Sequence, residues 1–294
     1  MALKWVKKEK KDEKEMSFLQ HLEELRWHII RSVLAILIFT IIAFLFKNFI
    51  FDSIILAPKN PGFFTNHILC QLGETVFNTK SLCINTRPFN LINIKMSGQL
   101  TTHIAVSMIS GVILAFPFII WEFWKFFRPA LYSKEKQYTK GAVLAATLLF
   151  FTGVVFGYYM IVPFSLHFLG TYEISSQVVN QINIRSYIGT LTSIVLASGL
   201  IFELPLVTYF LTKIGIITPA FLKKYRRHSI VVIFIIAAII TPPDVFSQTL
   251  VAIPLLGLFE IGILISKRVE KKKQKASDDF MNDNDDNNSE KTSQ

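Results

Sequence analysis

Long apolar runs alternate with short polar segments over most of this chain of 294 residues. A helix needs about 20 apolar residues to cross a bilayer. Four runs of about that length are present, at residues 29–46, 103–124, 142–164 and 191–212. A fifth apolar block, 229–265, is interrupted only around Pro242 and Pro243. Because two consecutive prolines cannot continue a helix, this block predicts two helices, 229–240 and 245–265.

The segment 229–240 is short for a membrane span. Its 12 residues make a helix about 18 Å long, whereas the hydrocarbon core is about 30 Å thick. It is either a short span that thins the bilayer or one arm of a re-entrant hairpin. Basic residues stand before it and after its partner helix, at Lys223, Lys224, Arg226, Arg227, Lys267 and Arg268. Since this places both ends of the pair on one side, we favour a short span. The prediction is an all-α integral membrane protein with six transmembrane helices, the last two short.

The composition supports a membrane protein. Hydrophobic residues make up 51% of the chain and charged residues 18%, and a soluble domain of this length usually carries more charge. Residues 1–16 contain no apolar segment of the kind found in a cleavable signal peptide. The first span is therefore expected to serve as its own uncleaved insertion signal.

The basic residues collect on one side of the predicted spans. The segments 1–26, 125–140, 213–228 and 267–294 hold 24 of the 31 Lys and Arg residues. The segments on the opposite side hold six, five in 47–101 and one in 165–190. Lys and Arg are enriched in cytoplasmic loops, so both termini are predicted to be cytoplasmic. The net charge of +10 then reflects membrane topology, and no nucleic-acid partner is expected.

The polar segments outside the spans form two tails and one long loop. Residues 1–16 and 271–294 are rich in charge and poor in hydrophobic residues, which predicts disordered cytoplasmic tails on either side of a membrane domain at 17–268. The outer loop 47–101 holds both cysteines, Cys70 and Cys83. On an oxidising face these can form a disulfide. The sequence leaves open whether they do so or stay as two free thiols.

The first helix is predicted to begin near Ser17, which forms a capping box with Gln20. An apolar stripe at helical spacing follows, formed by Phe18, Leu22, Leu25 and Ile29. This stripe predicts that the first turns lie along the membrane surface before the helix enters the bilayer.

Two acids on the basic inner side, Glu24 and Glu135, allow two interpretations. Glu24 can pair with His28 one helical turn away, and Glu135, the only acid between Lys125 and Lys140, can neutralise the surface around it. Alternatively, the two carboxylates face the same compartment and together receive a cationic peptide.

Glu203 lies near the middle of the fourth apolar run. A charge at that depth costs about 2.5–3.5 kcal/mol on insertion scales, so an intramembrane acid is a functional candidate. Pro205 loosens the same helix and can free a carbonyl for a polar partner. Two other acids have simpler local explanations, since Asp244 can cap the last span and Glu260 can snorkel at its inner end.

The sequence contains no enzyme motif. It has no Gly-rich phosphate loop, no HExxH and no cluster of metal ligands, so neither catalysis nor a cofactor is expected. Besides a peptide receptor, two functions remain open. One is a proton-coupled small-molecule carrier with Glu203 as its proton site, which would need a polar midplane pocket and internal repeats. The other is a structural scaffold that organises partner helices.

Five segments stand out in this order: HLEELR before the first span, FRPALYSKEK after the second, FELP in the fourth, and ITPPDVFSQTLVAIPL and LFEIGI across the final hairpin. Together they resemble motifs of the TatC family, the core membrane subunit of the twin-arginine protein translocase. The resemblance covers about residues 17–268. The long outer loop 47–101 departs from the compact loop expected of the family.

The resemblance implies a receptor for signal peptides with two consecutive arginines, on proteins that are exported already folded. It assigns the docking site to Glu24 and Glu135, supported by Leu22, Arg26, Pro129 and Tyr132. It matches Glu203 to the family's intramembrane acid, and it matches Pro242, Pro243, Asp244 and Gln248 to the hairpin motif. It further implies small single-span Tat subunits (TatA/TatB type) as partners and a hetero-oligomeric complex with several copies. The expected location is the bacterial cytoplasmic (inner) membrane, with transport driven by the proton-motive force and without ATP hydrolysis by this subunit.

Overall fold

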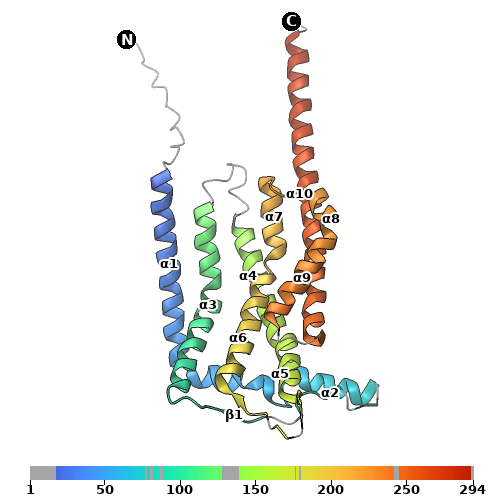
Figure 1. The fold of residues 1–294 in the computed structure, drawn as a ribbon. Coiled ribbons are helices and arrows are strands. Elements are labelled where there is room, and N and C mark those ends of the chain that lie inside the picture. The colour runs from blue at the N-terminus through green and yellow to red at the C-terminus, as the bar shows by residue number, and fades with distance from the viewer. Residues whose placement is uncertain are drawn as a thin grey trace.

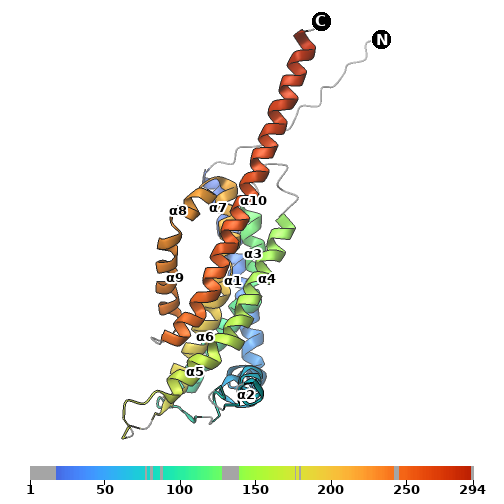
Figure 2. The ribbon, with the colours of Figure 1, turned by 90° about the vertical axis from the view of Figure 1, so that its right-hand side faces the viewer.

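The computed structural model of the chain describes residues 18–76, 78–79, 82–86, 89–127, 139–175, 177–178, 180–241 and 245–292. Helices run side by side along the long axis of the molecule, and a shorter layer of structure crosses one end of them (Figures 1 and 2). We call the end at which the first helix begins the upper end, as in Figure 1, and the opposite end the lower end.

Within the described residues, five helical stretches are long and apolar enough to cross a membrane: Leu22–Leu45, Gly98–Phe126, Gly141–Thr171, Ile184–Ile214 and Gln248–Gln274. They coincide with five of the six predicted apolar runs. The chain is therefore an all-helical membrane protein, as its sequence predicts.

The first two spans are single helices, α1 (Phe18–Leu45) and α3 (Gly98–Phe127). Helix α1 continues without interruption from Phe18 into the span, so the predicted segment along the membrane surface is wrong. Its residues form one helix because no proline or glycine interrupts them, and the hydrogen-bond ladder of a helix continues wherever no such residue breaks it.

The third and fourth spans are each divided by a proline. In the third, α4 (Thr139–Phe156) passes through a π-helix, η5 (Gly157–Ile161), into α5 (Val162–Thr171). In the fourth, α6 (Ile184–Ile201) gives way to α7 (Leu204–Ile214) after a turn at Phe202 and Glu203. Pro163 and Pro205 lie in the first turns of α5 and α7. Because proline has no N–H to donate, the regular helix is interrupted just before each of them.

The final hairpin differs from its prediction in one arm. After α8 (Pro219–Lys224), helix α9 (Arg226–Ile240) has 15 residues and is about 22 Å long at the helical rise, which agrees with the predicted short helix. Helix α10 (Val245–Thr292) has 48 residues. The predictions of a short last helix and of disorder over 271–294 are therefore wrong as far as Thr292. The chain contains no glycine or proline after Gly262, and nothing in the sequence stops this helix where its apolar part ends.

A cap covers the lower ends of the spans. It contains the π-helix η1 (Phe49–Ile55), the 3-10 helix η2 (Ala57–Lys59), helix α2 (Phe64–Val76), and strands β1 (Leu91–Ile92) and β2 (Ile182–Asn183), which pair in parallel. Helix α2 lies across the spanning helices instead of along them (Figure 1). The sequence predicts only a loop for this region.

The spans pack through a small number of helix pairs: α1 against α3, α4 against α6, and α10 against α7 and α9. At Gly111 of α3 a Cβ atom would lie 2.8 Å from the backbone nitrogen of Thr40, so only glycine allows α1 to approach this closely. Helices α7 and α10 are joined by a buried hydrogen bond in which Thr212 Oγ1 donates to Ser266 Oγ over 2.8 Å. Helix α1 packs mainly on α3, and most of its remaining apolar surface is exposed.

Candidate functional site

Glu24 lies in the second turn of α1, at the upper end of the molecule (Figure 1). Glu24 and His28 are half-buried, whereas Leu22, Glu23 and Arg26 are exposed. Since α1 packs on α3, the half-buried stripe is the side of α1 that faces α3. Glu24 is therefore held beside the neighbouring helix, while Glu23 points into open space.

A buried carboxylate that the sequence analysis did not single out lies one turn further along this stripe. Glu122 of α3 is only 1% exposed. Its Oε2 is 2.6 Å from His28 Nδ1 and 3.7 Å from Arg31 Nη1, and its Oε1 is 2.8 Å from Lys125 Nζ. We call Glu122 with these three bases the Glu122 cluster. It joins α1 to α3 just below the level of Glu24.

The signal for Glu122 was present in the sequence. It is an acid inside the second predicted run, 103–124, so the rule that singled out Glu203 applies to it equally. Lys125 is a neighbour at helical spacing, but the partners on α1 could not be found in the same way, because His28 is 94 positions away in the chain and belongs to another helix.

The Glu122 cluster changes the expected pairing of Glu24. The sequence allows an ion pair between Glu24 and His28, but His28 instead contacts Glu122 across the helix interface. Among the residues that the structure describes, neither Glu24 nor Glu23 forms an ion pair. The carboxylate of Glu122 contacts three basic side chains, whereas the half-buried carboxylate of Glu24 has no ion-pair partner among the described residues.

Several predicted site residues lie outside the described residues. These are Glu135, Pro129 and Tyr132, in 128–138, and Pro242, Pro243 and Asp244. Helix α3 ends at Phe127 and α4 begins at Thr139, both at the upper end, where α1 begins (Figure 1). The chain therefore leaves and rejoins the described structure at the end that holds Glu24.

Glu203 lies at the break between α6 and α7. Its Oε1 is buried, and it has no hydrogen-bond partner among the residues in the described ranges. A buried polar atom without a partner is costly. An acid with an unsatisfied buried oxygen inside a span is a candidate functional residue.

Two further predicted residues join α10 to α9. Gln248 Nε2 donates to the backbone oxygen of Phe234 over 3.1 Å near the lower end. Glu260 Oε1 is 2.6 Å from Arg226 Nη2, and both side chains are about half-exposed. Gln248 thus has a definite role in the packing of the hairpin, and Glu260 forms an ion pair instead of only snorkelling.

An apolar groove of about 880 Å³ opens between α1, η1, α3, α4 and α6. Apart from two tyrosines, its polar lining is limited to Ser53, Ser110 and Thr192. Glu203 does not line it. A proton-coupled carrier with Glu203 as its proton site would need a polar pocket around that residue, and this groove does not provide one.

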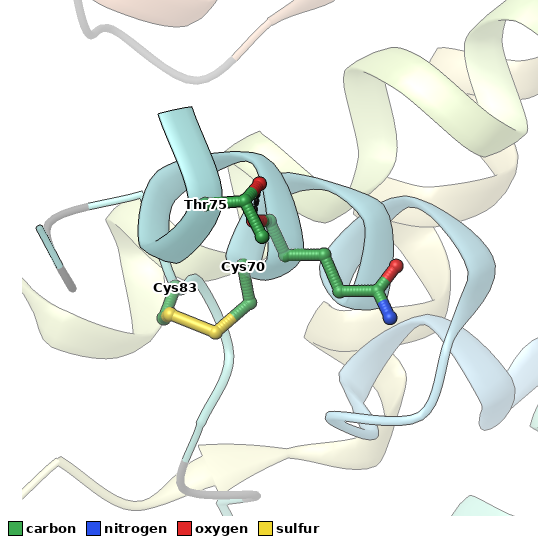
Figure 3. Close-up of a disulfide and its surroundings, with 4 residues drawn as sticks. Cys70, Thr75 and Cys83 are labelled. Carbon is green, nitrogen blue, oxygen red and sulfur yellow. Dashed lines mark hydrogen bonds between the residues drawn. A yellow bond between two sulfur atoms is a disulfide. The ribbon is translucent and has the colours of Figure 1, made fainter. Parts of the chain in front are cut away.

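The two cysteines form a disulfide between α2 and the segment that follows it (Figure 3). In the part of the chain that the structure describes, Cys70, Cys83 and Glu74 are the one group with metal-ligand spacing. Both sulfurs are bonded to each other, so this group has no thiolate to offer a metal.

Comparison with known proteins identifies the same family as the motifs. The profile of the family described as "Sec-independent protein translocase protein (TatC)" matches residues 20–254. The Sec-independent protein translocase protein TatC of Blattabacterium sp. subsp. Periplaneta americana is 41% identical over 265 residues, which cover 90% of this chain and 100% of that protein. The TatC of Desulforapulum autotrophicum is 34% identical over 275 residues, covering 94% and 93%.

Solved structures agree with the sequence comparison. The crystal structure of the twin-arginine translocase receptor TatC in DDM superposes with a TM-score of 0.65 at 36% sequence identity. The match covers 84% of this chain and 99% of that one. A second crystal structure of the twin-arginine translocase receptor TatC superposes with a TM-score of 0.63 at 35% identity.

Proposed function

The chain belongs to the TatC family and is the receptor subunit of a twin-arginine translocase, and from this premise we propose that Glu24 and Glu135 together receive the paired arginines of a signal peptide. The subunit is a non-enzymatic component of a transport system. Its task at this site is to bind a cationic peptide reversibly.

The observation that carries the proposal is the state of Glu24. It is half-buried against α3 at the upper end and has no ion-pair partner in the described part of the chain. A carboxylate held on a helix can accept two parallel hydrogen bonds from one guanidinium. The neighbouring acid, Glu122, is already surrounded by bases, so an incoming arginine gains less there than at Glu24.

Glu135 supplies the second carboxylate in this proposal. Two guanidiniums that approach a basic surface are repelled unless local acids meet them. Arginine suits such a site because its planar group pairs bidentately with carboxylates, which lysine cannot do. Leu22 and Arg26 are exposed beside Glu24, and with Pro129 and Tyr132 they are assigned to supporting contacts around the dipeptide.

The proposed orientation places the upper end in the cytoplasm, with both termini on that side. The segments assigned to the cytoplasm hold 24 of 31 Lys and Arg residues. Helix α8 and the end of α10 are at the same upper end as the start of α1 (Figure 1). Six spans, with α9 as a short sixth crossing, are consistent with this arrangement, and the membrane is the bacterial cytoplasmic (inner) membrane.

The proposed partners are small single-span subunits of the TatA and TatB type, in a hetero-oligomeric complex with several copies. Helix α1 supports this because it leaves a long apolar side uncovered, including Val33, Leu37 and Ile41, each about half-exposed. A second transmembrane helix can pack on such a side. The proton-motive force is the proposed energy source.

Binding of a twin-arginine peptide to the purified protein in detergent tests the docking site. Wild type is compared with Glu24→Ala and Glu135→Ala, and Glu23→Ala serves as the matched control because it removes the same charge from the exposed neighbouring position. A charge-assisted hydrogen bond contributes roughly 1.5–3 kcal/mol. The affinity of each docking variant for the peptide should therefore be lower by about tenfold or more. The control should bind like wild type. Undiminished binding in both docking variants would overturn the assignment and would favour a scaffold that tolerates their loss.

A further inference from the structure

Helix α2 has three distinct sides. One side faces the protein and holds two buried residues, Asn66 and Gly73. A second side is polar and open, with the exposed residues His67, Gln71 and Glu74. The third side is apolar and open. A helix buried only on one side normally exposes polar residues elsewhere, so the third side needs an explanation.

The open apolar side is a continuous stripe with a spacing of four residues. Phe64 is 65% exposed, Ile68 37%, Leu72 45% and Val76 65%. Residues four apart lie nearly one above the other on a helix, so these side chains form one strip along the whole of α2. We call it the α2 stripe.

The orientation of α2 is firmly held. Asn66 Nδ2 donates to the backbone oxygens of Pro58 over 3.1 Å and of Asn60 over 2.8 Å. Thr65 Oγ1 donates to the backbone oxygen of Tyr159 in the third span. The α2 stripe therefore cannot turn inward without breaking these bonds.

The far end of α2 is held as well. The backbone N–H of Thr79 donates to the carbonyl oxygen of Gly73 over 3.0 Å. A Cβ atom at Gly73 would lie 2.8 Å from the backbone oxygen of Thr79, so the chain passes close to the helix at this point. The disulfide between Cys70 and Cys83 fastens the same crossing (Figure 3).

The α2 stripe is continuous with the surface of a membrane span. The ring of Phe64 lies against that of Tyr159 in η5, with 5.9 Å between ring centroids. Tyr159 belongs to the span Gly141–Thr171 and is 40% exposed, and Met160 and Val155 beside it are 45% and 53% exposed. Tyrosine is enriched where a span leaves the hydrocarbon core, so this contact marks the level of the membrane surface.

The axis of α2 runs across the spanning helices (Figures 1 and 2), so it lies along the plane of the membrane. We propose that α2 is an interfacial helix whose stripe of Phe64, Ile68, Leu72 and Val76 rests in the lipid at the lower membrane surface. The polar side, with His67 and Gln71, faces water. The occupant is lipid because the stripe extends the apolar surface of a span that is itself in contact with lipid.

The chemistry of α2 also defines which lipids matter. The segment FTNHILCQLGETV contains no Lys or Arg, so electrostatic attraction to anionic headgroups contributes nothing on this helix. The interaction depends on buried apolar area. It should therefore be the same in zwitterionic and anionic membranes.

Site-directed spin labels test the proposal in the full chain reconstituted into phosphatidylcholine vesicles. Ile68→Cys and Leu72→Cys place labels on the α2 stripe, and the matched controls His67→Cys and Gln71→Cys place them one position away on the polar side. Cys70 and Cys83 are bonded to each other and do not react, which labelling of the unsubstituted protein verifies. The collision rates of each label with oxygen, which concentrates in lipid, and with a water-soluble nickel chelate are measured.

Labels at 68 and 72 should collide severalfold more with oxygen than with nickel, at a depth of about 5–10 Å, and labels at 67 and 71 should show the reverse. The result should not change when phosphatidylglycerol is added to the vesicles. Equal nickel access at all four positions would mean that the stripe faces water and would overturn the proposal. Protection of 68 and 72 from both reagents would also overturn it, because a second copy of the chain would then cover the stripe. Neither result bears on peptide docking at the opposite end.

Discussion

His28 Nδ1 of α1 lies 2.6 Å from Glu122 Oε2 of α3, in a contact that is almost closed to solvent on the Glu122 side. The two residues are 94 positions apart, and they join α1 to α3 near the upper ends of both helices. Glu24 stands one turn above His28 on the same side of α1. The contact of Glu122 with His28 thus joins α1 to α3 one turn below Glu24, the acid of α1 that we propose as a docking residue.

Replacing Glu122 should destabilise the protein. Glu122→Ala leaves His28, Arg31 and Lys125 without their carboxylate. Removal of one partner from a buried ion pair costs about 3–5 kcal/mol. Arg31 and Lys125 are about half-exposed, so a smaller loss of about 1–3 kcal/mol is expected. Thermal unfolding in detergent measures it, with Glu122→Gln expected to fall between Ala and wild type.

Glu260→Gln is the matched control for Glu122→Gln. Its ion pair with Arg226 joins α9 and α10, but both side chains are about half-exposed, and such pairs contribute about 0–1 kcal/mol. If Glu260→Gln and Glu122→Gln lower the midpoint of thermal unfolding equally, burial does not account for the contribution of Glu122 to stability.

Glu203 should be needed for export although its side chain does not stabilise the protein. Because its Oε1 is buried without a partner in the described structure, Glu203→Leu removes an unsatisfied atom and should leave thermal stability unchanged or raise it by about 1–3 kcal/mol. Export should nevertheless be lost. Glu203→Gln keeps a polar group of the same shape and should retain more export than Glu203→Ala.

Cells that carry each variant, assayed for export of a twin-arginine substrate with expression as control, distinguish the roles of Glu203. An equal loss of export in the Glu203→Gln and Glu203→Ala variants would indicate that the carboxylate carries a proton. Full export by the Leu variant would mean that Glu203 is incidental.

The topology should be visible to a membrane-impermeant maleimide. Lys224 is exposed in α8 at the upper end, and Asn93 is exposed in the lower cap. In whole cells whose outer membrane has been permeabilised, Asn93→Cys should be labelled. Lys224→Cys should stay protected until the cytoplasmic membrane is permeabilised as well. The reverse pattern would place the lower cap in the cytoplasm and would contradict the charge distribution.

The disulfide should matter for the lower cap and not for the docking site. A cross-link that closes a loop of this length contributes about 3 kcal/mol in the chain-entropy model. In the double variant Cys70→Ser with Cys83→Ser, amide hydrogen exchange in Phe64–Val76 should become faster. Peptide binding should stay at the wild-type level, since α2 and the start of α1, which carries Glu24, lie at opposite ends of the molecule (Figure 1). Weaker peptide binding would reveal a coupling between the two ends.

The main spans could be predicted from the sequence because each depends on a local property. Apolar length placed α1, α3 and the helices around η5, and the prolines at 242 and 243 placed the hairpin. Features that depend on contacts between distant residues could not be predicted. The Glu122 cluster needs the register of α1 against α3, which a Thr40–Gly111 contact determines and no periodicity reveals.

Two other differences arise from weak local signals. Helix α2 is a short amphipathic helix in a segment with several prolines nearby, and its tertiary contacts through Asn66 and Cys70 stabilise it. Helix α10 passes Ile265 into residues 271–292, whose charge and polarity predict disorder. A stable apolar helix that precedes such a segment supplies the nucleus, which is the costly step of helix formation.

The docking site should discriminate arginine from lysine. Glu24 and Glu135 are each flanked by basic residues, so their attraction is weak at a distance and felt within the Debye length of about 8 Å. At contact the planar guanidinium forms two hydrogen bonds with one carboxylate, whereas an ammonium is a point charge. A signal peptide with two lysines should therefore bind about tenfold or more weakly than the twin-arginine peptide, a difference of about 1.4 kcal/mol or more.

The two acids should also be coupled. If Glu24 and Glu135 hold one dipeptide, removal of either loosens the grip of the other, and the double variant Glu24→Ala with Glu135→Ala should lose less than the sum of the single losses. Titration of wild type, both single variants and the double variant with the same peptide completes the cycle, and Glu23→Ala with Glu135→Ala is the control pair, expected to be additive. Strict additivity in the Glu24 and Glu135 cycle would mean that the two carboxylates contact separate parts of the signal peptide, and the shared docking site would have to be abandoned.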